Sequence, residues 1–450
     1  MLGSELAGRD IAILGAGREG RSALSWLRRQ FPDTPLTVYD ERAVSLEPDP
    51  LTTVVEGPLE AERLRKHDVL IRSPGISPYR PALRLARAAG VRCTSASSLW
   101  FAAHPQLNTI CITGTKGKST TAALTAHLLK AAGLRVQLAG NIGTPLLDCP
   151  DDAADWWVIE LSSYQLADLE ARPSLAAILN VSDEHLDWHG GAAAYRRDKL
   201  RLAELAAGAP LILNFSDRLL LAEFSQDENV RWFGHAEGWH VLENELYFGS
   251  QALPDLPRNR LPGPHNLENL AAALTLLQAA GISGLDLRPA LTDFKGLPHR
   301  LQYLGTVGGV EFVNDSLATT PVATVAALEA YRGRPVILLI GGLDRGLDWT
   351  QPLARMQGLC PQAVICLPDS GAGLAAAMAA AGLLPGRGIH VVPDLEAGMR
   401  RVAGLSRTGD VVLLSPGAPS FPHFRDYAER GERFAAAAGI NNEKETAGLG

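Results

Sequence analysis

The sequence TICITGTKGKST, residues 109–120, places a short apolar strand directly before a glycine-rich loop. An alanine- and leucine-rich helix follows the loop and ends at Gly133. Such a loop supplies backbone amides for phosphates, a lysine for the β and γ oxygens and a hydroxyl for Mg²⁺. Ile112 stands where the general P-loop motif has its first glycine, so one of four landmarks is missing. The stretch still predicts a phosphate site made of Gly114, Thr115, Lys116, Gly117, Lys118, Ser119 and Thr120.

Polar groups follow the next two strands along the chain. Glu160 comes at the end of the apolar strand 157–159, where an α/β fold presents a metal ligand near a bound phosphate. The segment that follows strand 177–179 contains His185, whose neutral nitrogen can bind a metal or position a phosphate. A surface glutamate and a solvated loop are the alternative interpretations of these two segments.

A second glycine loop lies near the beginning of the chain. GAGREG, residues 15–20, fits G-x-G-x-x-G between the strand 11–14 and a helix over 22–29, and the next strand ends at Asp40. This arrangement predicts a nucleotide-phosphate turn. Because amides at a helix N-terminus accept any pyrophosphate, the loop leaves a nicotinamide dinucleotide, a UDP-sugar and a tight turn without ligand all open.

Strands and helices alternate along most of the 450 residues, which predicts an α/β protein with several domains. The alternation restarts after residue 297. We therefore expect domains over 1–97, 98–296 and 297–440, and a disordered polar tail over 441–450.

Composition excludes several classes of protein. The charged residues, 42 Lys and Arg against 49 Asp and Glu, form no long basic run, which argues against a nucleic-acid partner. Five scattered cysteines indicate neither a disulfide framework nor a thiolate zinc site. No apolar run is long enough to span a membrane and no secretory signal is apparent, so we expect a cytoplasmic protein without membrane contact.

The motifs together resemble the Mur ligases, the ATP-dependent amino-acid ligases of peptidoglycan synthesis. Eight elements occur in the family order: GTKGKS (114–119), GNIG (140–143), ELSS (160–163), NV with HLD (180–187), YRRDK (195–199), HN (265–266), LPHR (297–300) and NDS (314–316). GAG (15–17), SPG (73–75), SP (415–416) and SF (420–421) extend the resemblance over nearly the whole chain.

The resemblance implies an α/β fold of three domains, in which N- and C-terminal Rossmann-like domains flank a central P-loop-type ATPase domain. It implies a monomer that uses ATP and two Mg²⁺ ions to join glutamate to UDP-N-acetylmuramoyl-L-alanine through an acyl phosphate. D-glutamate is the expected enantiomer, and L-glutamate followed by a separate epimerase is the alternative. A nicotinamide-dinucleotide oxidoreductase is the alternative of a different class. Folylpolyglutamate synthetases are disfavoured because they have no counterpart of residues 1–95.

Functional residues are implied by the same resemblance, position by position. Lys118, His185 and a carbamylated Lys199 would be catalytic, although the sequence alone gives Lys199 the pattern of a helix-surface lysine. The metal ligands would be Ser119, Glu160, His185 and Lys199. ATP would also meet Asn266, Arg300 and Asp315. The sugar nucleotide and glutamate would contact Gly17, Arg18, Asp40, Arg42, Ser73, Gly75, Asn141, Gln165, Thr319, Arg345, Ser420 and Phe421.

Two positions depart from the family pattern. Leu317 stands where many relatives have a lysine, and the cation after Gly341-Gly342 is Arg345. The first change removes a charge from the region where ATP and glutamate are expected to meet, so it bears on amino-acid recognition.

Overall fold

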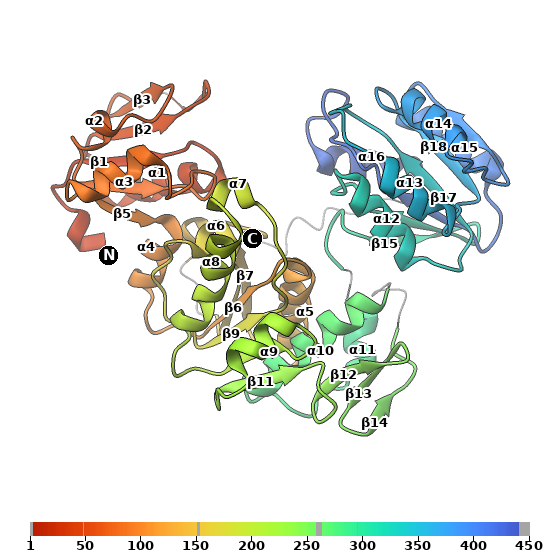
Figure 1. The fold of residues 1–450 in the computed structure, drawn as a ribbon, viewed down its shortest axis with the longest axis horizontal. Helices are drawn as coiled ribbons and strands as arrows, with labels where there is room; N and C mark the ends of the chain where they lie inside the picture. Colours follow the sequence, from red (N-terminus) through yellow and green to blue (C-terminus); the bar gives the residue numbers. More distant parts are fainter. Residues whose placement is uncertain (1–2, 48, 151–153, 258–262, 295, 441–450) are drawn as a thin grey trace. The chain divides into compact units, whose positions relative to one another are not determined.

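The computed structural model describes the chain except for residues 1–2, 48, 151–153, 258–262, 295 and 441–450. The predicted tail therefore lies outside the described residues. The chain divides into two compact units (Figure 1). Apart from the undescribed residues, the first unit covers Met1–Pro254 and Glu268–Leu285, and the second covers Asp255–Leu267 and Asp286–Gly448.

The first unit begins with a parallel five-stranded sheet in the order β3-β2-β1-β4-β5. Its strands are β1 (Ile11–Leu14), β2 (Leu36–Asp40), β3 (Thr52–Glu56), β4 (Val69–Arg72) and β5 (Arg92–Ser95). Helices α1 (Arg18–Gln30) and α4 (Ala96–Ala103) pack on one face, and α2 (Ala61–Leu64) and α3 (Pro81–Ala88) on the other. Because helices cover both faces, β1 is buried along its whole length.

A second parallel sheet of the same unit has six strands in the order β11-β10-β9-β6-β8-β7. They are β6 (Thr109–Thr113), β7 (Val136–Gly140), β8 (Trp156–Glu160), β9 (Leu175–Ile178), β10 (Leu211–Asn214) and β11 (Val230–Phe233). The accompanying helices are α5 (Lys118–Ala131), α6 (Ser163–Leu166), α7 (Leu186–His189), α8 (Ala192–Leu205), α9 (Arg218–Phe224) and α10 (Pro264–Ala279). A small antiparallel sheet contains β12 (Trp239–Leu242), β13 (Glu245–Phe248) and β14 (Gln251–Leu253).

The strand order of this second sheet places the predicted site residues at one edge. Strands β7, β8, β6 and β9 are neighbours and parallel, so the segments that follow them meet outside their carboxyl ends. Open α/β sheets bind ligands at this edge. Asn141, Glu160, the loop 114–120 and the segment 180–187 all lie there.

The second unit contains a mixed six-stranded sheet in the order β15-β16-β20-β17-β18-β19. The strands are β15 (Gln302–Val307), β16 (Val310–Asn314), β17 (Val336–Ile340), β18 (Ala363–Cys366), β19 (Ile389–Val391) and β20 (Val411–Leu414). Only the edge strand β15 runs antiparallel to its neighbour among these described strands. One face holds α12 (Pro321–Ala330), α13 (Thr350–Gln357) and α14 (Gly371–Ala380), and the other holds α15 (Leu395–Leu405) and α16 (Tyr427–Ala437).

The helix α11 (Leu287–Thr292) belongs to the second unit, which resumes at Asp286. This division precedes the boundary predicted at residue 297, and the first unit contains the predicted domain 1–97 together with most of the predicted domain 98–296. None of the described helices is long and apolar enough to cross a lipid bilayer.

Candidate active site

The loop between β6 and α5 requires glycine at two positions. Gly117 has a φ of 84°, and a Cβ added there would lie 2.3 Å from Oδ1 of Asn269. A Cβ on Gly114 would lie 2.9 Å from Cβ of Leu179. The loop therefore packs closely against its neighbours, and any larger residue would displace it.

Lys118 is the first residue of α5, and its Nζ donates to the carbonyl oxygen of Thr115 at 3.0 Å. Ser119 and Thr120 follow in the first turn, where free amides and the helix dipole attract phosphate. Thr115 and Lys116 are engaged within the protein instead: Thr115 Oγ1 bonds the Tyr195 hydroxyl at 2.7 Å, and Lys116 pairs with Glu184. The structure thus leaves the turn that begins at Lys118 as the anion-facing part of the loop.

Lys199 lies on α8 and is only 2% exposed, which contradicts its surface pattern in the sequence. Its Nζ donates to the carbonyl oxygen of Gly114 at 2.9 Å and lies 3.4 Å from Oγ1 of Thr113. Burial lowers the pKa of Lys199 well below its usual value, and Lys118 adds to this effect, while Glu184 and Glu160 oppose it. The amine therefore lies beneath the phosphate loop in surroundings that favour its neutral form.

Glu160 ends β8 and is completely buried. Its Oε1 accepts a hydrogen bond from Nδ2 of Asn141 at 2.7 Å, but Oε2 has no partner among the described residues. A buried carboxylate oxygen without a partner is costly, because it has lost its water and gained no donor. This open oxygen at the carboxyl edge of the sheet fits a hard cation such as Mg²⁺.

His185 directly precedes α7 and adopts a left-handed backbone conformation with a φ of 54°. Its ring centroid lies 5.1 Å from that of Tyr164, which stacks on Trp188 at 4.2 Å. Burial lowers the pKa of His185, nearby Lys118 and Lys199 act in the same direction, and Glu184 opposes them. A neutral imidazole has a nitrogen lone pair, which can bind a metal ion or accept a hydrogen bond from a protonated phosphate oxygen.

In the described part of the chain, no group of three or more His, Cys, Asp and Glu side chains could hold a metal ion. Of the four predicted metal ligands, only Glu160 and His185 belong to these residue types. Among the described residues, these four side-chain types therefore do not form a preassembled metal cage.

The N-terminal glycine loop is held by hydrogen bonds to its backbone. Asp40 accepts from the amides of Ala16 at 2.8 Å and Arg42 at 3.0 Å, and Ser73 Oγ donates to the carbonyl oxygen of Gly15 at 2.8 Å. A Cβ on Gly20 would lie 1.8 Å from that same carbonyl oxygen, so the last glycine of the motif allows α1 to pack on the turn. The predicted contacts Gly17, Arg42 and Gly75 are exposed.

Two predicted substrate residues instead join parts of the first unit. Arg18 donates to the carbonyl oxygens of Asn141 at 2.9 Å and Gly143 at 3.2 Å. Gln165 is 2% exposed, completes a capping box with Ser162 and donates to Glu19 at 3.1 Å. The structure therefore shows structural contacts for both residues.

The predicted ATP residues Arg300 and Asp315 come together in the second unit. Asp315 follows β16, and its carboxylate accepts from the Leu301 amide at 3.1 Å and the Ser415 hydroxyl at 2.7 Å. Burial raises the pKa of Asp315 to about 6, while these hydrogen bonds and Arg300 act against the rise. Asn266 lies in the first turn of α10 and is 6% exposed.

The predicted glutamate residues have contrasting environments. Arg345 is exposed and has no ion-pair partner within the described residues, and the nearby carboxylates of Asp344 and Asp348 accept backbone N–H groups at 2.8 Å. Phe421 is 64% exposed, and Thr319 is half-buried. Ser420 is 8% exposed and lines a cavity of about 110 Å³. Leu317 is exposed, so its side chain replaces the missing lysine at a solvent-facing position.

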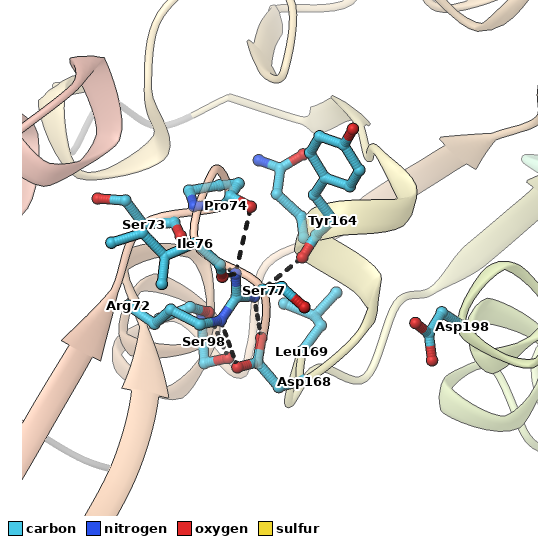
Figure 2. Close-up of polar contacts among 12 residues, drawn as sticks. Arg72, Ser73, Pro74, Ile76, Ser77, Ser98, Tyr164, Asp168, Leu169 and Asp198 are labelled. Atoms are coloured by element: carbon cyan, nitrogen blue, oxygen red, sulfur yellow. Dashed lines mark hydrogen bonds and ion pairs between the residues drawn. The ribbon is translucent and has the colours of Figure 1, made fainter. Parts of the chain in front are cut away.

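Sequence reasoning missed the residues that join the two sheets of the first unit. Arg72 is 1% exposed and forms an ion pair with Asp168 (Figure 2). The only sequence signal is an arginine at the end of an otherwise apolar strand, VLIR.

A second missed group contains Asp198, His189 and Ser163. Asp198 Oδ2 lies 2.7 Å from Nδ1 of His189, and Nε2 of His189 lies 3.1 Å from Oγ of Ser163. The order is that of a hydrolytic triad, but all three residues are at most 4% exposed, so no substrate reaches the hydroxyl. The Tyr79 hydroxyl donates to Oδ1 of Asp198 at 2.5 Å, so the group fixes α8, the helix that carries Lys199.

A phosphate loop, a buried lysine and an open carboxylate at one sheet edge define a nucleotide-using α/β enzyme. Three family models cover most of the chain: Mur ligase MurD-like, N-terminal domain, over 9–95; Mur ligase middle domain, over 112–277; and Mur ligase, glutamate ligase domain, over 299–417. The chain belongs to the Mur ligase family. It is therefore an ATP-dependent, ADP-forming amino-acid ligase, which excludes the oxidoreductase alternative.

Several curated relatives match over almost their full length. UDP-N-acetylmuramoyl-L-alanine--L-glutamate ligase from Xanthomonas euvesicatoria is 44% identical, covering 97% of both chains. The proteins of that name from Xylella fastidiosa (strain Temecula1) and a Micromonospora species are 44% and 42% identical, covering 98% and 96% of this chain and 97% of each relative.

Solved structures share the fold at low sequence identity. UDP-N-acetylmuramate-alanine ligase from Thermotoga maritima superposes with a TM-score of 0.57 at 17% identity, covering 96% of this chain and 99% of that one. MurF ligase from Thermotoga maritima, solved with ADP, gives 0.56 at 19% identity, covering 95% and 93%. With the family matches, this likeness confirms the predicted three-domain α/β architecture.

Proposed function

We propose that this enzyme joins L-glutamate to UDP-N-acetylmuramoyl-L-alanine with conversion of ATP to ADP and phosphate, in cytoplasmic synthesis of the peptidoglycan precursor. The observation that carries the proposal is 44% identity over 97% of the chain to ligases named for L-glutamate. The expected D enantiomer becomes the alternative. Use of L-glutamate requires a separate epimerase afterwards if the cell wall contains D-glutamate at this position.

The reaction needs ATP because a carboxylate does not react with an amine while hydroxide would have to leave. The alanyl carboxylate attacks the γ-phosphorus and becomes an acyl phosphate, and ADP departs. The deprotonated amine of glutamate then attacks the acyl carbon, and phosphate leaves as the amide forms. Positioning and charge neutralisation are the tasks left to the protein.

Lys118 would support the first step because it begins α5, where the helix amides would face a bound phosphate. Ser119 and the open oxygen of Glu160 would hold one Mg²⁺, which would neutralise charge on the β- and γ-phosphates. His185 and an anionic Lys199 would hold the second ion. Asn141 then orients the Glu160 carboxylate through its 2.7 Å hydrogen bond.

Carbamylation would make Lys199 anionic. The neutral amine attacks CO₂, its nitrogen loses one proton to solvent, and the product is an N-carboxylate. Burial supports this step because the low pKa provides the free amine that a protonated surface lysine lacks. A carbamate here would also place an anion close to the Lys118 ammonium, which attracts it.

The remaining predicted residues divide by substrate. Gly17, Arg42 and Gly75 are exposed and would contact the sugar nucleotide. Asn266, Arg300 and Asp315 would contact ATP, and Thr319, Arg345, Ser420 and the amide of Phe421 would bind the carboxylates of glutamate. Arg345 supplies the only full charge in this last group and carries no competing carboxylate among the described residues.

The test incubates the enzyme with UDP-N-acetylmuramoyl-L-alanine, MgATP and either enantiomer of glutamate, and follows phosphate release and product mass. L-glutamate should give ADP and the ligated product in equal amounts, with D-glutamate at least tenfold slower. Preference for D-glutamate would contradict the enantiomer, and no ADP formation with either would contradict the reaction. The purified enzyme should behave as a monomer in the same buffer.

A further inference from the structure

Arg72 uses all of its donor groups inside the protein. Nε and Nη2 donate to the two carboxylate oxygens of Asp168 at 2.8 and 2.5 Å, and Nη2 also donates to the carbonyl oxygen of Tyr164 at 2.9 Å. Nη1 donates to the carbonyl oxygens of Ser73, Pro74 and Ile76 at 3.1, 3.3 and 2.7 Å. Figure 2 shows the guanidinium between the loop after β4 and the segment that contains α6.

The loop 73–76 has four successive carbonyl groups, and each of them accepts a hydrogen bond from a side chain. Arg72 holds three, and Nε1 of Trp188 donates to the fourth, that of Gly75, at 3.1 Å. Trp188 is fixed in turn, because Oγ of Ser77 donates to its carbonyl oxygen at 2.7 Å. The guanidinium carbon of Arg72 also lies 5.7 Å from the Trp188 ring centroid.

This arrangement determines where the amides of the loop point. In a trans peptide unit the C=O and N–H groups point in opposite directions. The Pro74 carbonyl points at Arg72, so the N–H of Gly75 points away from it. That N–H has no acceptor among the described residues, and Gly75 is exposed with nothing within 4 Å of an added Cβ. The loop thus presents a free donor to open space.

Arg72 also fixes this loop relative to the second sheet. Tyr164 lies in α6 and Asp168 lies just after it. Gln165 of the same helix contacts Glu19 on α1. Because Arg72 is 1% exposed and the Asp168 side chain 12%, their ion pair is little screened by water. The Arg72 guanidinium, together with the Trp188–Gly75 hydrogen bond, therefore couples the Gly75 loop to the edge that carries His185 and Trp188.

We propose that Arg72 is a positioning residue for the sugar nucleotide: it turns the loop carbonyls inward so that the Gly75 amide can donate to the diphosphate of the substrate. This rests on the proposed function, which supplies the diphosphate. Arg72 touches no substrate. Its effect is to hold a donor in place before binding, which removes the cost of ordering the loop.

The test uses Arg72→Lys in the full-length enzyme, because lysine keeps the charge but cannot supply the planar fork that reaches both Asp168 and the loop. We expect the KM for UDP-N-acetylmuramoyl-L-alanine to rise at least tenfold, with the KM values for ATP and glutamate within twofold of wild type. Asp168→Asn, which keeps one acceptor, should raise the same KM by a smaller factor. Hydrogen exchange should accelerate over residues 73–77.

Arg92→Lys is the matched control, because Arg92 lies on the neighbouring strand β5 and pairs with Glu5 at the surface. It should leave all three KM values unchanged. A merely structural role of Arg72 predicts a lower melting temperature and fewer active molecules, which lower kcat without selecting one substrate. A folded Arg72→Lys enzyme with an unchanged sugar-nucleotide KM, or with all three KM values raised together, would overturn the proposal. Failure of the proposed function is a separate result, since the wild-type enzyme would then lack ligase activity.

Discussion

Lys199 in the first unit and Arg345 in the second both have basic side chains with predicted roles in the reaction, yet their environments are opposite. Lys199 is 2% exposed, its Nζ lies against the phosphate loop, and its pKa is lowered by burial. Arg345 is exposed in the segment after β17 and lacks an ion-pair partner in the described structure. The lysine proposed to carry the carbamate is thus already packed beneath the phosphate loop, whereas the arginine proposed to bind glutamate is exposed to solvent.

The difference in exposure between Lys199 and Arg345 agrees with the roles proposed for them. A buried amine can react with CO₂ only if packing suppresses its charge, so its surroundings must be rigid and dry. An arginine that receives a free amino acid needs a charged, unoccupied fork, and exposure keeps both. We therefore expect substitutions of Lys118 and Lys199 to affect kcat and substitution of Arg345 to affect the KM for glutamate.

The largest effect is expected for Lys118→Ala. Removing a cation positioned at the transferring phosphoryl group should lower kcat by at least about 100-fold, equivalent to about 3 kcal/mol. Binding of the sugar nucleotide, measured by calorimetry, should change by no more than a few-fold. Lys130→Ala at the other end of α5 is the control and should keep normal turnover. A Lys118→Ala enzyme that retains more than a tenth of wild-type kcat would remove this lysine from the mechanism.

Lys199→Ala should lower kcat by about 100-fold as well, because it deletes the proposed anion. Formate or acetate should restore part of the activity by occupying the vacated position, and neither salt should accelerate the wild-type enzyme. Lys199→Ala with normal turnover, or an active, bicarbonate-supplied enzyme whose Lys199 shows a bare ammonium, would contradict the carbamate.

Arg345→Ala should raise the KM for glutamate by about 30-fold, which corresponds to about 2 kcal/mol for a lost bidentate carboxylate contact. The KM for ATP should stay within twofold. Arg355→Ala, which removes an exposed arginine paired with Glu329 on α12, is the control in the same unit. An unchanged glutamate KM would separate Arg345 from amino-acid recognition and end the contrast with Lys199.

The smallest effect concerns stability and comes from Glu19. Burial raises its pKa from 4.5 to about 6, so its contribution to the unfolding free energy is full below pH 4.5 and is lost as the pH rises through 6. Allowing for its partial exposure, the loss is about 1 kcal/mol. Glu19→Gln should remove this part of the pH dependence in urea unfolding between pH 4.5 and 7. If the unfolding free energies of the two proteins changed with pH in parallel, the pKa of Glu19 would not be raised in the folded state.

Much of the fold is local enough to be predicted. The strands predicted at 11–14 and 157–159 fall on β1 and β8 because they are continuous apolar runs. The predictions did not include β3, whose pattern is mostly exposed, or the antiparallel edge strand β15, since the pairing of an edge strand depends on residues distant in sequence.

For the site, the sequence by itself determined the two glycine loops, the strand-end position of Glu160 and the chemistry available at each. The backbone conformation of a glycine loop and the position of a residue at a strand end depend on neighbouring residues in the sequence, so a motif is sufficient to locate them.

Only the tertiary structure decided which polar groups are buried and which remain open. In the tertiary structure Lys199 is buried under Gly114, and Oε2 of Glu160 has no partner among the described residues. Arg18 and Gln165 make structural contacts. Arg72 binds Asp168 and the loop 73–76. Each of these outcomes depends on a contact between segments far apart in the chain. Burial and pKa are properties of that packing, which no local pattern of residues encodes.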